Sequence, residues 1–388
     1  MNSLSIYVHF PFCSGKCAYC DFYSKPSVCG TDLDTYTDAV IAHIRQKSPS
    51  FRHRTVVTVY FGGGTPSILG ARNLCRVLDA IRTDFTLSAD CEITTEANPG
   101  DIYLDTDPNP DSRTAALQLL RSSGFNRISF GVQSSNDEEL RTLGRRHNFK
   151  KAVEAVLDAK SAGFDNLTLD LMYGLPGQTD ETWQKSLSDI VALAPAHISC
   201  YALRLEEGTP LYARLADLPD DDTVSDRYLA AVEFLVQHGY QQYEVSNYAK
   251  PGCESRHNSR YWIGGNYLSF GPAAHSYLDG VRYAYTSDTS SYIAAVNAGQ
   301  EPAYSEYTVL TQKDQLEEAI MLRLRTASGL DPDILTAQFG IDTDSIEQKL
   351  RRYVKHGLCK TDGRIFSLTP EGMFVQNSII LDILDEII

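Results

Sequence analysis

The sequence predicts an α/β fold, in which a partial barrel of parallel strands carries a smaller C-terminal module. Short runs of β-branched and aromatic residues alternate with longer segments of helical period, the pattern of parallel strands joined by crossover helices. Six such units follow one another, which predicts a partial, TIM-like (βα)6 barrel with functional residues at the carboxyl ends of its strands. The predicted strands are residues 5–10, 56–61, 91–96, 127–132, 166–172 and 197–203.

Each gap between the predicted strands has room for one helix. The helical candidates are 35–47, 72–85, 113–125, 151–164 and 181–194, and 226–240 follows the sixth strand. The next stretch, from residue 243, is rich in tyrosine and glycine and too aromatic for a linker. We therefore expect three parts: a barrel at 1–240, an extension packed on it at 241–309, and a C-terminal module at 310–388.

The C-terminal module shows helices followed by a hairpin, which predicts a winged-helix-like α+β unit. Winged helices that bind DNA need a basic surface. Residues 310–388 contain 9 Lys and Arg against 13 Asp and Glu, a net charge of −4. We expect this module to pack on the barrel or cover it.

The composition limits the class of protein. Among 388 residues, 35 Lys and Arg stand against 50 Asp and Glu, so the formal net charge is −15 and no nucleic-acid partner is expected. No apolar run approaches the roughly 18 residues of a membrane span, although peripheral membrane contact stays open. The first residues, MNSLSIYVHF, do not form a secretory signal, which predicts a cytoplasmic protein with reduced cysteines.

Three cysteines, Cys13, Cys17 and Cys20, form a C-x3-C-x2-C pattern directly after the first predicted strand. Three thiolates on one short loop suit an iron-sulfur cluster, which usually has four cysteine ligands, so one iron would be open to another molecule. Zinc is the weaker alternative, because Cys29 and His9 lack the usual paired spacing of a closed site. A disulfide framework is weaker still, since the chain has nine cysteines and no export signal.

Further motifs stand where predicted strands end. Residues 62–66, Gly-Gly-Gly-Thr-Pro, would let backbone N–H groups bind a carboxylate or hydroxyl, although a bare turn also favours glycine. Glu96 could hold an amine or cap the next helix. Gln133 offers an amide, and Asp170 interrupts an apolar strand, where a charge needs a partner. Arg145 is the candidate for a ligand carboxylate, with a solvated helix end as its alternative.

The sequence IYVHFPFCSGKCAYCDFYS, followed in order by GGGTP, TTEANP, FGVQS, LGRRH and DLMYGLPGQT, resembles the radical S-adenosylmethionine (radical SAM) superfamily. Within it, the chain is similar to the oxygen-independent coproporphyrinogen dehydrogenase-like group over almost its whole length. The resemblance implies a radical SAM barrel, in which three cysteines hold a 4Fe-4S cluster and S-adenosylmethionine takes the open iron. In this superfamily, reduction cleaves S-adenosylmethionine to a radical that abstracts hydrogen.

Position by position, the resemblance implies that Cys13, Cys17 and Cys20 bind the cluster. Tyr7 would flank S-adenosylmethionine, although a core position is its alternative. The other residues that the resemblance assigns to S-adenosylmethionine are Tyr19 beside it, Gly63, Gly64 and Thr65 at its methionyl end, and Glu96, Gln133, Arg145 and Asp170 in its polar shell.

Two departures separate this chain from the dehydrogenases of the group. Those enzymes carry a further cysteine at the position of Phe22 and a long N-terminal extension, whereas twelve residues precede Cys13 here. The string HNSRYW at 257–262 instead resembles the heme chaperones of the group, which pass heme to acceptor proteins. We therefore predict heme binding and transfer, with an electron donor for the cluster and no catalytic residue assigned. A coproporphyrinogen III dehydrogenase and a heme-modifying methyltransferase are the alternatives.

His257 is the candidate heme ligand within that string. Histidine is a usual axial ligand of heme iron, and neighbouring aromatic rings can stack on the macrocycle. Cys253 and His275 are rival ligands. The alternative for His257 is a hydrogen-bonded position in the core.

Overall fold

The computed structural model describes residues 3–26, 30–101 and 110–385, so Cys29 lies outside the described residues. Its centre is a twelve-stranded sheet in the order β14-β13-β12-β11-β1-β4-β5-β6-β7-β8-β10-β9. The six predicted strands are confirmed as parallel neighbours. They are β1 (Ser3–Phe10), β4 (Thr55–Gly63), β5 (Thr86–Ala97), β6 (Arg127–Gln133), β7 (Asn166–Tyr173) and β8 (His197–Ala202).

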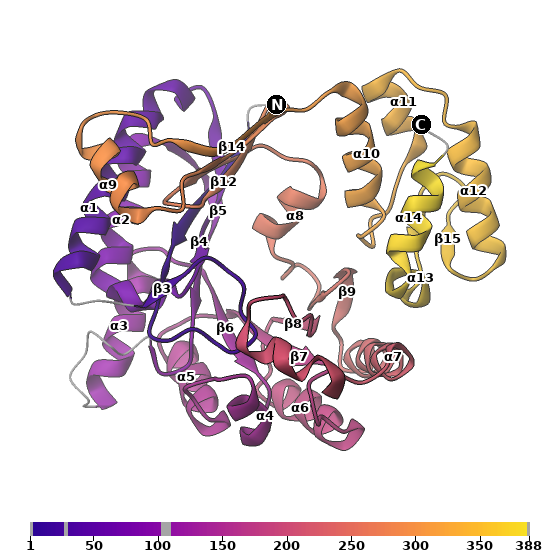
Figure 1. Cartoon of the computed structure of the whole chain (residues 1–388), viewed down its shortest axis with the longest axis horizontal. Coiled ribbons are helices and arrows are strands. Elements are labelled where there is room, and N and C mark those ends of the chain that lie inside the picture. The colour runs from indigo at the N-terminus through magenta and orange to yellow at the C-terminus, as the bar shows by residue number, and fades with distance from the viewer. Residues whose placement is uncertain (1–2, 27–29, 102–109, 386–388) are drawn as a thin grey trace.

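Helices cover the outer face of this sheet, as Figure 1 shows. Strands such as β1 and β7 are buried on both faces, which explains why they appear in the sequence as nearly continuous apolar runs. The predicted helices are confirmed, with α4 and short 3-10 turns at 48–51, 66–69 and 210–217 in addition. The helices are α1 (Gly30–Lys47), α2 (Gly70–Asp84), α3 (Pro110–Ser122), α4 (Asp137–Thr142), α5 (Phe149–Ser161), α6 (Asp180–Ala192) and α7 (Asp221–Gln237).

A seventh parallel strand, β11 (Tyr267–Phe270), lies on the other side of β1 and was not predicted. The sheet continues from β11 through the antiparallel strands β12 (His275–Leu278), β13 (Val281–Tyr285) and β14 (Tyr304–Val309), with α9 (Thr289–Asn297) between the last two. At the opposite edge, β10 (Asn247–Ala249) and β9 (Gln241–Glu244) follow β8. A two-residue strand pair, β2 (Phe12–Cys13) and β3 (Lys25–Pro26), brackets the cysteine loop.

The C-terminal module stands to one side of the barrel (Figure 1). The predicted helices and hairpin are present as α10 (Gln312–Arg323), α11 (Pro332–Phe339), α12 (Asp344–Lys355), β15 (Cys359–Thr361) and β16 (Phe366–Leu368). Two short helices that were not predicted, α13 (Pro370–Phe374) and α14 (Gln376–Leu384), follow the hairpin. The module packs on α7, where the ring centroids of Tyr228 and Phe374 are 5.7 Å apart. The division of the chain at residues 240 and 309 stays a prediction.

The helices that the structure describes include none with the length and apolar content to cross a membrane.

Candidate functional site

The predicted cofactor residues meet at one end of the barrel, at the carboxyl ends of the parallel strands. A cavity of about 500 Å³ lies there. Except for Tyr7, every residue predicted to bind the cluster or S-adenosylmethionine lines it. These are Cys13, Cys17, Tyr19, Cys20, Gly63, Gly64, Thr65, Glu96, Gln133, Arg145 and Asp170. We call this space the first cavity.

The glycine turn after β4 fixes the start of the cysteine loop. The N–H groups of Gly64 and Thr65 donate to the carbonyls of Phe10 and Phe12, at 2.8 Å each. These two donors therefore anchor the loop, which corrects the expectation that they face a ligand. A Cβ atom on Gly64 would lie 2.6 Å from the Phe12 carbonyl oxygen and 3.1 Å from the Cys13 sulfur, so the close approach requires glycine.

The three thiols of the loop are free and border the first cavity. All eight cysteines in the described ranges are free. Within those ranges, no three His, Cys, Asp or Glu residues are already arranged around one point as the ligands of a metal ion. The Cys13 sulfur lies 3.6 Å from the Thr65 hydroxyl, and the Cys17 sulfur accepts from Arg145 Nη1 at 3.4 Å. Burial raises the pKa of Cys20, so coordination to iron would be needed to hold it as the thiolate.

Two buried carboxyl groups form the floor of the first cavity. Glu96, at the end of β5, accepts a hydrogen bond from the Tyr60 hydroxyl at 2.7 Å, and burial raises its pKa to about 7. Asp170, in β7, accepts from the Ser129 hydroxyl at 3.4 Å, and burial raises its pKa to about 6. Neither carboxyl has a cation in direct contact among the described interactions, so a positively charged ligand would stabilise their ionised forms.

Arg145 supplies positive charge on the wall of the same cavity. Its Nη2 donates to Asn98 Oδ1 and to the carbonyl of Gly131, both at 2.5 Å, while its buried Nε has no partner in the structure. A buried donor without a partner is uncommon and suits a carboxylate ligand. Asn98 was missed, although it stands two residues after Glu96; it also donates to the Thr65 hydroxyl at 2.9 Å. It links the arginine to the glycine turn.

Gln133 takes a backbone conformation that few residues with a side chain adopt. Its φ is 73°, in the left-handed region, and it is buried at the end of β6. Such conformations cost of order 1–3 kcal/mol and concentrate at ligand sites. The next residue, Ser134, donates to the Glu139 carboxylate at 2.6 Å, which holds this strand end against α4.

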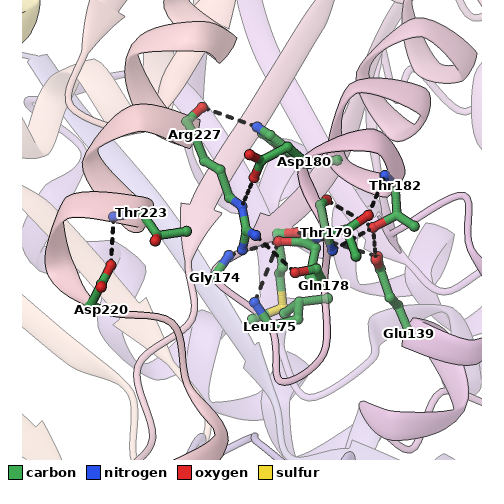
Figure 2. Close-up of polar contacts among 12 residues, drawn as sticks. Glu139, Gly174, Leu175, Gln178, Thr179, Asp180, Thr182, Asp220, Thr223 and Arg227 are labelled. Atoms are coloured by element: carbon green, nitrogen blue, oxygen red, sulfur yellow. Dashed lines mark hydrogen bonds and ion pairs between the residues drawn. The ribbon is translucent and has the colours of Figure 1, made fainter.

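The loop after β7 is held by Gln178, as Figure 2 shows. Gln178 Oε1 accepts from the N–H of Gly174 at 2.9 Å, and its Nε2 donates to Glu139 at 3.3 Å. Arg227 of α7 donates to the Gln178 carbonyl at 2.8 Å. Since Met172 precedes this loop and lines the first cavity, the network fixes one wall of it. The GLPGQT part of the motif is therefore supporting structure.

A second cavity, of about 490 Å³, lies beside the first. Tyr7 lines this second cavity instead of the first, so its place beside S-adenosylmethionine stays a prediction. Both cavities share Phe22, Gly63 and Glu96. A small polar cavity of about 60 Å³ inside the barrel also reaches Glu96, so this carboxyl borders three spaces.

His257 is a buried structural residue in this conformation. It lies in α8 (Arg256–Trp262) and is 1% exposed. Its Nδ1 is 2.8 Å from the Thr58 hydroxyl, and its Nε2 is 2.9 Å from the Tyr261 hydroxyl. Burial lowers its pKa to about 3. Both ring nitrogens are engaged, which speaks against the expected bond to heme iron.

The docking of α8 explains that burial. The carboxylate of Glu92, in β5, accepts the backbone N–H groups of Arg256 at 3.0 Å and His257 at 2.9 Å. A carboxylate at a helix N-terminus satisfies free N–H groups and the helix dipole together. The helix therefore enters the barrel with His257 inside and Tyr261 toward the second cavity.

Two protein-family models match this chain. The profile of the Radical SAM superfamily matches residues 7–190, and that of the HemN C-terminal domain matches residues 310–375. The Heme chaperone HemW of Lactococcus lactis is 35% identical, over 97% of this chain and 96% of that protein. The Heme chaperone HemW of Escherichia coli is 34% identical, over 97% of each.

Among solved structures, the coproporphyrinogen III oxidase HemN of Escherichia coli, a radical SAM enzyme, is similar with a TM-score of 0.84. It is 26% identical, and the match covers 100% of this chain and 91% of that one. HemN therefore has the same fold as this chain, and the two HemW proteins are more similar to it in sequence than HemN is. Because that identity extends over nearly the full length of both chains, this chain belongs to the HemW family of the radical SAM superfamily.

Proposed function

We propose that this protein is a heme chaperone, which binds heme and transfers it to an acceptor protein. The observation that carries the proposal is the identity of 35% to a Heme chaperone HemW over 97% of the chain. Phe22 supports it, because this residue stands where the related dehydrogenases carry a further cysteine. We also propose a cytoplasmic location and an electron donor for the cluster.

The residues of the first cavity fit the cofactors of the superfamily. Cys13, Cys17 and Cys20 would hold a 4Fe-4S cluster, and the open iron would take S-adenosylmethionine. Glu96 would face the positive sulfonium of that molecule, and Arg145 its carboxylate. When bound, the pair of cofactors supplies a reducing centre and a source of radical chemistry. The protein's own residues orient them and keep water from a buried, polar floor.

A second candidate function is oxygen-independent coproporphyrinogen III dehydrogenation. The similarity of the whole chain to HemN, with its TM-score of 0.84, favours it. The same fold supports many chemistries, however, so the fold does not decide between the two.

Two measurements on anaerobically reconstituted protein test the proposal. Heme is titrated, and the loaded protein is mixed with an apo heme protein while the spectrum is followed; we expect binding and transfer. In parallel, protein, reductant, S-adenosylmethionine and coproporphyrinogen III are incubated, and we expect no protoporphyrinogen. Production of protoporphyrinogen without heme binding would contradict the chaperone function and support the dehydrogenase function.

A further inference from the structure

The second cavity has a strongly aromatic wall. Tyr7, Tyr23, Tyr261 and Tyr267 line it together with Phe22. These residues come from β1, the cysteine loop, α8 and β11, which are far apart in the sequence and meet only in the folded chain. Flat rings around an open space favour a flat, largely apolar ligand.

Phe22 marks where such a ligand would enter. Its side chain is 73% exposed, the highest fraction among the large hydrophobic residues in the described ranges, and it lines both cavities. An exposed phenylalanine on a cavity wall gains free energy when a ligand covers it. Lys25, whose ammonium group lies 6.0 Å from the ring centroid of Tyr23, adds a cation near this wall, and Asp21 adds one carboxylate.

Two histidines also line the second cavity. His275, the first residue of β12, is exposed, and no described hydrogen bond engages its ring nitrogens. His9, in β1, is 6% exposed; its Nδ1 is 3.1 Å from the Tyr7 hydroxyl, and its buried Nε2 has no partner in the structure. Burial lowers the pKa of His9 to about 4, so this ring is neutral. Neutral imidazole is the form that binds metals.

We infer that the second cavity is the heme site, with Phe22 packed against the macrocycle and His275 as the axial ligand of the iron. This inference rests on the proposed function and names the place where it occurs. The macrocycle would then lie beside S-adenosylmethionine, with Glu96 and Gly63 in the wall between them.

The other candidate ligands are less suited. His9 lines the cavity, but it is only 6% exposed and its free Nε2 is buried, so iron could not reach that nitrogen without a shift of the ring. His257 has both nitrogens engaged, as described above. Tyr261 lines the cavity, but burial raises the pKa of its hydroxyl, so it stays a protonated phenol and a poor ligand. Cys253 is not among the residues that line the cavity. The HNSRYW string thus contributes through Tyr261, which His257 holds in place.

Heme titration of the reconstituted full chain tests this site. For His275→Ala we expect a shifted Soret band and a Kd raised at least about tenfold. Added imidazole should restore the band, because it replaces the lost ligand. For Phe22→Ala we expect a raised Kd for heme and an unshifted Soret band. His356→Ala, an exposed histidine of the C-terminal module, is the matched control and should equal wild type. All variants should keep wild-type iron and sulfide content.

The outcomes separate the site from the function. If wild type binds heme and both His275→Ala and Phe22→Ala leave spectrum and affinity unchanged, the site is wrong and the chaperone proposal stands. If the Soret band of His275→Ala is unshifted while Phe22→Ala binds heme more weakly, His275 is not the axial ligand, although the cavity remains the heme site. If wild type binds no heme at all, the proposed function fails together with the site.

Discussion

Binding of S-adenosylmethionine should weaken in mild acid, because two buried carboxyl groups of the first cavity then take up protons. Burial raises the pKa of Glu96 to about 7 and that of Asp170 to about 6. The positive sulfonium of S-adenosylmethionine favours the ionised forms of these carboxyl groups, so binding releases protons in this range. Affinity is therefore full above about pH 8 and falls as the pH drops through these two values.

The magnitude follows from the ionised fractions. With a pKa of about 7, Glu96 is roughly three-quarters ionised at pH 7.5 and about one-tenth ionised at pH 6.0, a change of about eightfold. With a pKa of about 6, Asp170 changes about twofold over the same interval. If both carboxyl groups must be ionised, the Kd for S-adenosylmethionine should rise about 16-fold between pH 7.5 and pH 6.0. In Glu96→Gln only Asp170 still titrates, so the Kd should rise about twofold over the same interval.

Isothermal calorimetry on reconstituted protein measures this. Titrations at both pH values, in two buffers of different ionisation enthalpy, give the affinity and the number of protons released. Glu244→Gln is the matched control, because Glu244 is also buried with a pKa raised to about 7 but does not line the first cavity. A pH slope that is absent in wild type, or unchanged in Glu96→Gln, would refute the assignment of this carboxyl to the ligand.

Three further predictions concern the cluster and its support. Cys13→Ala, Cys17→Ala and Cys20→Ala should each lose the visible absorbance and iron of the reconstituted cluster, whereas Cys359→Ala should keep both; full iron in Cys17→Ala would contradict the ligand set. Gly64→Ala should also impair cluster assembly, because its Cβ would meet the Phe12 carbonyl at 2.6 Å, while Gly15→Ala, whose nearest new contact is 3.5 Å, should not. Gln178→Ala should lower the free energy of unfolding by about 2 kcal/mol in urea denaturation, since several buried hydrogen bonds lose their partner, and the exposed Gln184→Ala should change it by less than about 0.5 kcal/mol; equal losses would contradict the role of the loop network.

The six parallel strands and their helices could be predicted because burial on both faces leaves apolar runs in the sequence. Functional residues of such barrels lie at the carboxyl ends of the strands, and this expectation placed Glu96, Gln133 and Asp170 together in the first cavity. Strand β11 has only four residues, and its place depends on pairing with β1, more than 250 residues away, as between Tyr7 and Ser269. No local pattern carries that information.

For a related reason, the second cavity could not be predicted, and the sequence could not decide between a heme-ligand role and a core position for His257. The string HNSRYW gives residue types, but burial depends on how α8 docks, and the carboxylate that holds its first turn is Glu92 in β5. His275 is similarly one residue of a short strand, and only the folded chain brings it to the same wall as Phe22. The sequence offers His9 only as a zinc ligand, because the residues that surround it in the second cavity are far from it in the sequence.

The position of Glu96 on the border of three cavities has a thermodynamic consequence. A ligand that fixes the charge of this carboxyl from one side changes the binding free energy of a ligand on the other side. Such coupling is reciprocal: the factor by which S-adenosylmethionine changes the affinity for heme is the factor by which heme changes the affinity for S-adenosylmethionine. With heme in the second cavity, as inferred above, this shared carboxyl would couple the release of the cargo to the concentration of S-adenosylmethionine.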